Sequence, residues 1–88
     1  MQDNKEKFIK SVCKIIKNRR KKLGKSIYQI SAESDILNST WRKAESGIYK
    51  DIKLITLWKM LEGLEFPPDE FMLELKNNLG CDFSFLDN

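Results

Sequence analysis

Histidine is absent from this 88-residue sequence, and only two cysteines, Cys13 and Cys81, are present. A zinc site of the Cys/His type needs ligands that the sequence does not supply, so we expect no metal site. One cysteine falls in an expected helix and the other beyond the last expected helix, which does not resemble the framework of a disulfide-stabilised secreted domain. We therefore expect free thiols in a reducing compartment, with Cys13 as a core residue.

Long apolar runs are also missing. No stretch approaches the roughly 18 residues that a membrane span requires, and residues 1–7 lack the apolar segment of a secretory signal. There is no glycine-rich phosphate loop, and the scattered carboxylates form no nucleophile–base pair. These absences predict a cytoplasmic protein that is not an enzyme, contacts no membrane, and uses no cofactor or small-molecule ligand.

The charge that is present is unevenly distributed. Residues 1–26 contain ten Lys or Arg and two acidic residues, whereas residues 60–88 contain one Lys and seven acidic residues. A basic N-terminal part suits contact with phosphate groups, and an acidic C-terminal part is better turned away from nucleic acid. A solvated helix face produces the same pattern, so charge alone does not decide the function.

Apolar spacing predicts five helices and no strand. The first helix is expected over residues 4–23, where intervals of three, four and seven place five side chains on one face: Phe8, Val12, Ile15, Ile16 and Leu23. Helices are also expected over about 26–34, 38–46 and 68–79. The remaining helix is expected to bury a stripe of Ile55, Trp58, Leu61 and Leu64. The predicted fold class is all-α, a compact five-helix bundle with one domain over residues 1–80 and an apolar tail over 81–88.

Residues with defined backbone preferences mark the ends of the second and third expected helices. Ser26 and Gln29 fit a capping box, in which the Ser26 hydroxyl accepts from the Gln29 amide and the Gln29 side chain reaches back. Asp35 suits the turn because Asp tolerates left-handed backbone angles, and Gly47 suits the end of the third helix. Two short helices joined by a tight turn are typical of a DNA-binding helix-turn-helix, although an ordinary helical hairpin has the same spacing.

The residues over about 12–71 resemble the helix-turn-helix family of phage Cro and C1 repressors, often called the Xre family. The most specific part of the match is the combination of Arg20, Ser26 and the Glu45-Ser46-Gly47 segment. Further matching positions are Ile16, Gly24, Gln29, Ile30, Ser31, Ile36, Ser39, Thr40, Leu57, Trp58, Leu61, Leu64, Asp69 and Glu70. The resemblance implies a five-helix fold of the phage-repressor type, with the helix-turn-helix at its second and third helices.

The resemblance also implies roles for individual residues. Arg20 and Glu45 correspond to a buried ion pair that ties the first helix to the end of the third. The positions expected to face base edges are Asn38, Ser39, Arg42 and Lys43, whose side chains suit adenine or guanine edges. The positions expected to contact phosphates are Lys25, Ser26, Ser46, Lys50 and Lys53.

The sequence departs from the family pattern around the turn. Ile27 replaces a phosphate-binding glutamine, Asp35 replaces the usual turn glycine, and the loop after Gly47 is one residue longer. Leu37 stands where a polar N-cap is usual, and if Asn38 takes over the cap its side chain turns away from bases. Trp41 and Ala44 are expected on the inner face of the third helix, where a large and a small residue conserve core volume. A base-stacking role for Trp41 is the alternative.

Two functions are consistent with these observations. The first is a sequence-specific transcriptional regulator that binds a palindromic operator in double-stranded DNA as a homodimer, in the size range of phage repressors and restriction–modification controller proteins. The alternative is a protein-interaction module, such as an antitoxin or adaptor, on the same fold. The expected dimer contact consists of apolar residues of the last helix and tail: Phe71, Met72, Leu75, Leu79, Phe83 and Phe85.

Overall fold

The computed structural model describes residues 4–86 of the chain. In this part five helices and no strand are present, in the order α1 (Asn4–Lys22), α2 (Ile27–Ser34), α3 (Asn38–Ser46), α4 (Leu54–Gly63) and α5 (Pro68–Leu79). The radius of gyration is 13.0 Å, close to the about 12 Å expected for a compact chain of this length. The predicted all-α class with five helices is therefore confirmed.

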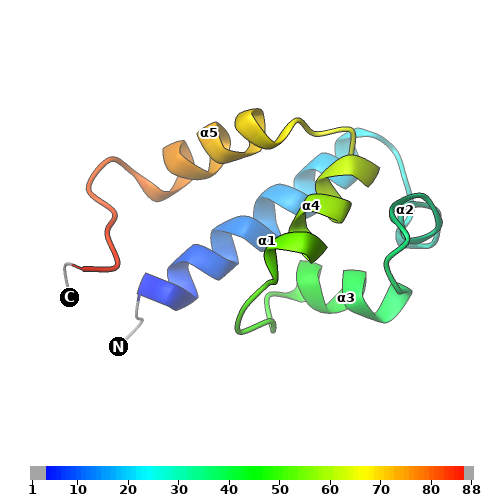
Figure 1. Cartoon of the computed structure of the whole chain (residues 1–88), viewed down its shortest axis with the longest axis horizontal. Helices are drawn as coiled ribbons and strands as arrows, with labels where there is room; N and C mark the ends of the chain where they lie inside the picture. Colours follow the sequence, from blue (N-terminus) through cyan, green and yellow to red (C-terminus); the bar gives the residue numbers. More distant parts are fainter. Residues whose placement is uncertain (1–3, 87–88) are drawn as a thin grey trace.

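Helices α3 and α5 pack against the long helix α1, and α2 packs against α3 and α4. Figure 1 shows α5 along one side of α1 and α3 on the other, with α4 crossing between them and α2 viewed almost end-on. The core is formed by all five helices, the α2–α3 turn and the α4–α5 connection: Val12, Ile15, Ile16, Ile30, Ile36, Trp41, Ala44, Met60, Leu61, Leu64, Phe66, Phe71 and Leu75. Cys13 is also buried, and burial raises the pKa of its thiol.

The ends of α2 follow the expected residue preferences in part. The Ser26 hydroxyl accepts a hydrogen bond from the Gln29 backbone amide at 3.0 Å. The Gln29 side chain does not reach back to Ser26, because it donates to Glu33 at 3.3 Å, so only half of the predicted capping box is formed. Asp35 closes α2 with a left-handed φ of 57°, as predicted.

Trp41 belongs to the core. Its side chain is fully buried, and its indole Nε1 donates to the Ser34 hydroxyl at 2.9 Å, which in turn donates to the Ile30 carbonyl at 2.7 Å. A buried indole N–H needs such a partner. Ala44, on the same face of α3, is also fully buried. The prediction of a large and a small residue inside is confirmed, and a base-stacking role for Trp41 is excluded by its burial.

The crossing of α2 and α4 requires a glycine that the sequence pattern did not single out. A Cβ atom at Gly63 would lie 2.7 Å from the Ser34 Cβ, which is too close for any real contact. Gly63 therefore lets α4 approach the same serine that holds the Trp41 indole. This approach fixes the rotation of α4 about its axis.

The prediction for the buried face of α4 was half wrong. Leu61 and Leu64 are buried as expected, but Ile55 and Trp58 are 74% and 50% exposed. The inner face is completed instead by Met60, with Leu57 partly buried. Both sets of residues have helical spacing, so spacing could not distinguish them.

The prediction for the dimer contact also needs correction. Phe71 and Leu75 are buried inside the protomer, so they are core residues and are not available to a second copy. Phe83 and Phe85 in the tail pack against Phe8 of α1, with ring centroids 6.1 and 5.3 Å away. Leu79 is partly buried against the core, and Met72 is about half exposed. The tail thus covers the start of α1, while Phe85 itself remains about half exposed.

Candidate nucleic-acid interface

Helix α3 has one buried face and one polar exposed face. Trp41 and Ala44 face the core. Ser39, Arg42 and Lys43 are all exposed, and their spacing of three and four residues places them on one stripe. We call these three residues the α3 stripe. Three of the four residues expected to face bases therefore lie together on the solvent side of α3.

Asn38 lies apart from this stripe. It is partly buried, and its Oδ1 atom is fully buried without a hydrogen-bond partner among residues 4–86. The N-cap of α3 is Leu37, whose side chain makes no capping hydrogen bond. Asn38 does not take over the cap, but its amide oxygen still points inward. An unsatisfied buried acceptor typically costs about 1–3 kcal/mol.

The N-terminus of α3 is open. Leu37, which precedes it, is 74% exposed and supplies no side-chain acceptor. The first N–H groups of a helix lack partners within the helix, and the dipole makes this end positive. An uncapped, exposed helix N-terminus is suited to an anion such as a phosphate.

The predicted ion pair between α1 and α3 is confirmed. Arg20 Nε and Nη2 donate to the two carboxylate oxygens of Glu45 at 2.5 and 2.8 Å, and the side chains are 13% and 6% exposed. The hydrogen bonds to Glu45 raise the pKa of Arg20, so the guanidinium stays charged. Its Nη1 also donates to the Lys25 carbonyl at 2.8 Å. This bidentate contact holds the C-terminal end of α3 against α1.

Lys25 is not positioned as a phosphate donor. Its ammonium lies 2.5 Å from Glu33 and 3.1 Å from Glu65, and its side chain is 16% exposed. The hydrogen bonds to these two carboxylates raise the pKa of Lys25, and the Lys25 ammonium lowers the pKa of Glu33. Lys25 therefore joins α2 to the end of α4, and its assignment as a phosphate contact is withdrawn.

The other four residues expected to contact phosphates are exposed, but they differ in whether a hydrogen-bond donor is free. Lys50 and Lys53 lie in the α3–α4 loop and form no ion pair with residues 4–86. Ser26 uses its oxygen as the cap of α2, which leaves the hydroxyl proton free to donate. The Ser46 hydroxyl instead donates to the Lys43 carbonyl at 2.9 Å. Lys50, Lys53 and Ser26 are the better donors.

Arg19 is a structural residue that the sequence analysis missed. Its guanidinium donates to the carbonyls of Leu64 and Glu65 at 3.1 and 2.5 Å and lies 4.5 Å from the centre of the Phe66 ring. It thereby caps the C-terminal end of α4. Because Arg19 stands in a run of four basic residues, nothing in the sequence separates it from its neighbours.

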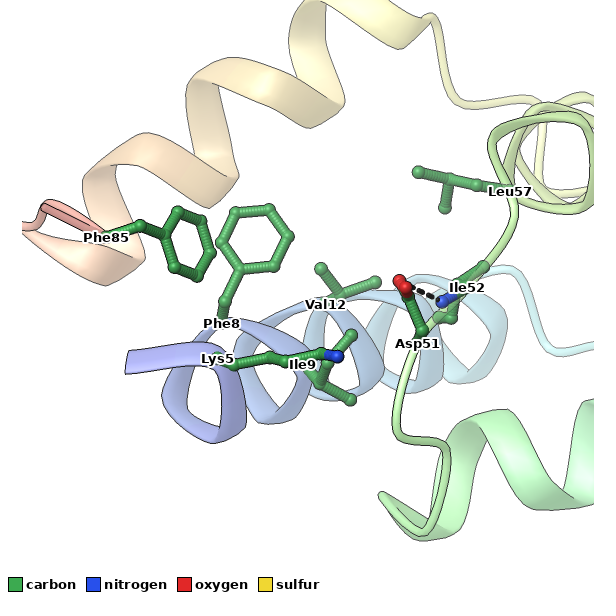
Figure 2. A pocket seen from close by; sticks show the side chains of 8 residues that line it. All are labelled: Lys5, Phe8, Ile9, Val12, Asp51, Ile52, Leu57 and Phe85. Carbon is green, nitrogen blue, oxygen red and sulfur yellow. Dashed lines mark hydrogen bonds between the residues drawn. The ribbon is translucent and has the colours of Figure 1, made fainter. Parts of the chain in front are cut away.

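One hollow away from α3 lies between α1, α4 and the tail, and it is small and apolar. Figure 2 shows Phe8 and Val12 of α1, Leu57 of α4 and Phe85 of the tail around it. Its volume is ≈ 220 Å³, below the roughly 300–1,000 Å³ of typical small-molecule sites. The nearby Asp51 carboxylate accepts from the Ile52 amide at 2.9 Å. Nothing in this hollow resembles a set of converging polar groups.

Residues 4–86 contain neither a metal-binding cluster nor a helix that could span a membrane. No group of three or more His, Cys, Asp or Glu side chains there could hold a metal ion. None of the described helices is both long and apolar enough to cross a membrane.

Comparisons with family models, with curated proteins and with solved structures found no significant match to this chain.

Proposed function

We propose that the chain binds double-stranded DNA and regulates transcription, with α2 and α3 as a helix-turn-helix of the Cro/C1 type. In this proposal α3 enters the major groove and α2 lies across the backbone. The observation that carries it is the α3 stripe: Ser39, Arg42 and Lys43 share the solvent face of a helix whose other face is held by Trp41 and Ala44.

The chemistry of the stripe suits base edges. Arg or Lys can donate to guanine O6 and N7, and a serine hydroxyl can pair with several bases. A helix that contacts base edges must also be held rigidly, because a small displacement of the helix breaks the hydrogen bonds between its side chains and the bases. The Arg20–Glu45 contact at one end of α3 and the Trp41–Ser34 hydrogen bond near its middle supply that rigidity.

Contacts to the DNA backbone have sources on both sides of the stripe. The uncapped N-terminus of α3 offers backbone N–H groups, and Lys50 and Lys53 offer ammonium groups after its C-terminus. Such contacts position the protein and carry no sequence information themselves. They also predict that log affinity falls linearly with log salt, by about 0.9 per phosphate neutralised.

One observation favours the alternative function, a protein-interaction module. Tyr28 and Leu37 are 78% and 74% exposed and line the same hollow beside the turn between α2 and α3. Large exposed apolar side chains often mark protein contacts. They are also compatible with DNA, because apolar groups can contact thymine methyls. The basic stripe beside them favours DNA.

The decisive experiment is a selection of genomic DNA fragments by the purified protein at low salt, followed by footprinting. We expect enrichment of discrete fragments and protection of short half-sites. The Arg42→Ala/Lys43→Ala variant should lose this enrichment. The exposed Lys76 on α5 provides a control, because Lys76→Ala should still enrich the same fragments. No retention of any fragment at low salt would favour the interaction module.

A further inference from the structure

Helix α1 carries five lysines in one line along its solvent side. Lys7, Lys10, Lys14, Lys17 and Lys21 are all exposed, and spacings of three and four residues make them neighbours on the helix surface. We call these five residues the α1 lysine stripe. Its first and last members are 14 residues apart, or about 21 Å along the helix axis. The stripe therefore follows most of the length of α1.

Most of the charge of this stripe is not neutralised within the described part of the chain. Glu6 is the single acidic residue of α1, and its carboxylate lies 2.9 Å from the Lys10 ammonium. Lys14, Lys17 and Lys21 form no ion pair with any of residues 4–86. The central and C-terminal parts of the stripe therefore carry uncompensated positive charge.

The stability of α1 does not explain the middle of the stripe. Cations in the last turn of a helix interact favourably with its dipole, which accounts for Lys21. Lys14 and Lys17 lie before that turn. Lys14 is four residues from Lys10, and Lys17 is four residues from Lys21, and like charges four residues apart destabilise a helix. A polyanion bound along α1 would remove this repulsion.

The stripe lies on a side of α1 that no other helix covers. Arg20 holds α3 through its contact with Glu45. Lys21 projects about 100° away from Arg20 around the helix, because successive residues of an α-helix are rotated by that angle. Helices α3 and α5 pack on other sides of α1 (Figure 1). The α1 lysine stripe is therefore separate from the α3 stripe.

Both ends of the stripe lie beside residues expected to contact phosphates. Lys10 lines a hollow together with Lys50 of the α3–α4 loop. At the other end, the Lys21 carbonyl accepts from the Gly24 amide at 3.0 Å, in the short turn that leads to Ser26, the N-cap of α2. The stripe thus connects two edges of the candidate nucleic-acid interface. This continuity, together with its charge, favours DNA as the polyanion.

We propose that the α1 lysine stripe is a second DNA-contact surface, which binds backbone phosphates without reading sequence. The phosphates belong to the DNA that flanks the segment held by α3 or to a second duplex. The length of the stripe, about 21 Å, corresponds to about six base pairs at 3.4 Å each. Only the identity of the partner rests on the proposed function, because the stripe uses none of Ser39, Arg42 and Lys43.

The test compares two variants that each remove two positive charges. Lys14→Gln/Lys17→Gln changes the stripe, and Lys59→Gln/Lys76→Gln changes exposed lysines of α4 and α5. The melting temperature of the stripe variant should not fall, because like-charge neighbours are removed. On a long duplex that contains a selected fragment, the stripe variant should bind about tenfold more weakly or worse at low salt if flanking DNA is the source. Its salt slope should fall by about 1.8, or 0.9 for each of two phosphates.

Two further measurements distinguish the sources of the phosphates. If flanking DNA is the source, the stripe variant should bind a duplex trimmed to the footprint as tightly as the unmodified protein does. If a second duplex is the source, the unmodified protein should retain a labelled random duplex on an immobilised selected one, and the stripe variant should not. The control variant should behave like the unmodified protein in every measurement.

Two results would overturn the proposal while leaving the proposed function intact. One is a stripe variant that matches the control on the long selected duplex and in the retention of a second duplex. The other is an equal loss of affinity for the trimmed duplex, which would make these lysines part of the α3 site. A protein that selects no fragment, but whose binding to random DNA loses salt slope in the stripe variant alone, would contradict only the proposed function. Absence of all DNA binding would contradict both.

Discussion

Helices α3 and α4 are built on the same plan but leave different surfaces outside. Each is about ten residues long and buries one face, with Trp41 and Ala44 on α3 and Met60 and Leu61 on α4. The outer face of α3 is polar and basic, whereas that of α4 is apolar. Burial explains why each helix forms and packs. In the proposed function, the basic outer face of α3 is the part that meets phosphates and base edges.

Substitution of the two tryptophans tests this division between inner and outer faces, and it should give the largest difference in the free energy of unfolding. Trp41→Ala should lower the free energy of unfolding by about 3–5 kcal/mol, because it removes a large buried side chain and the hydrogen bond that its indole donates to Ser34. Trp58→Ala, on the outer face of α4, should change it by less than about 1 kcal/mol. Urea unfolding at concentrations too low for association measures both. Equal losses would contradict the assignment of the faces.

A pair of acidic residues provides the next comparison. Glu45→Gln on α3 should cost about 3 kcal/mol of stability, because the guanidinium of Arg20 loses its charged partner in a mostly buried site. Glu62→Gln on α4 removes an exposed carboxylate and should have almost no effect on the monomer. Thermal unfolding of the two variants, monitored by circular dichroism, tests the difference. A similar melting temperature for both would indicate that the ion pair is not an anchor of α3.

Asn38→Ala should have a small effect on the free energy of unfolding, and the change should be stabilising or absent, whereas most substitutions are destabilising. The buried Oδ1 atom has no partner within residues 4–86, so its removal should leave stability unchanged or raise it by up to about 1 kcal/mol. Chemical denaturation measures this change. A matched variant, Thr40→Ala at a similarly half-buried position, serves as the comparison. A clear loss of stability for Asn38→Ala would show that the amide makes a structural contact.

The smallest expected effect concerns pH. Lys25 lowers the pKa of Glu33 in the folded protein. The ionised Glu33 carboxylate therefore contributes to the stability of the fold above its unfolded-state pKa of about 4.3. This contribution is lost as the pH falls through the lower folded-state pKa. The raised pKa of Lys25 affects stability only on the alkaline side. Lys25→Met should therefore flatten the acid limb of the stability profile, and Lys76→Met should not. An unchanged acid limb would contradict the ion pair.

The sequence predicted α3 better than α4, and the reason is physical. Polar and apolar residues separate cleanly in α3, and Gly47 ends it, so both its bounds and its buried face could be predicted. The start of α4 contains Leu54, Ile55, Leu57 and Trp58, so several faces are equally apolar. The close approach of Gly63 to Ser34 decides which face of α4 is buried. This is a tertiary contact, and the spacing of apolar residues cannot predict it.

The candidate site, like the fold, could be predicted only in part. The outward-facing positions Ser39, Arg42 and Lys43 and the Arg20–Glu45 pair all followed from the family resemblance. The role of Lys25 could not be predicted, because its partner Glu65 lies 40 residues away in the chain. The burial of Phe71 and Leu75 likewise depends on how α5 packs against α1.

The central claim, that the α3 stripe reads DNA sequence, is tested most directly by competition between a selected fragment and random DNA. Arg42→Ala should lower the ratio of the two affinities by a factor that corresponds to about 1–3 kcal/mol, because a bidentate guanine contact is lost. Lys50→Ala should weaken both DNAs equally and reduce the salt slope by about 0.9. An unchanged affinity ratio for Arg42→Ala, at an intact fold, would contradict the claim.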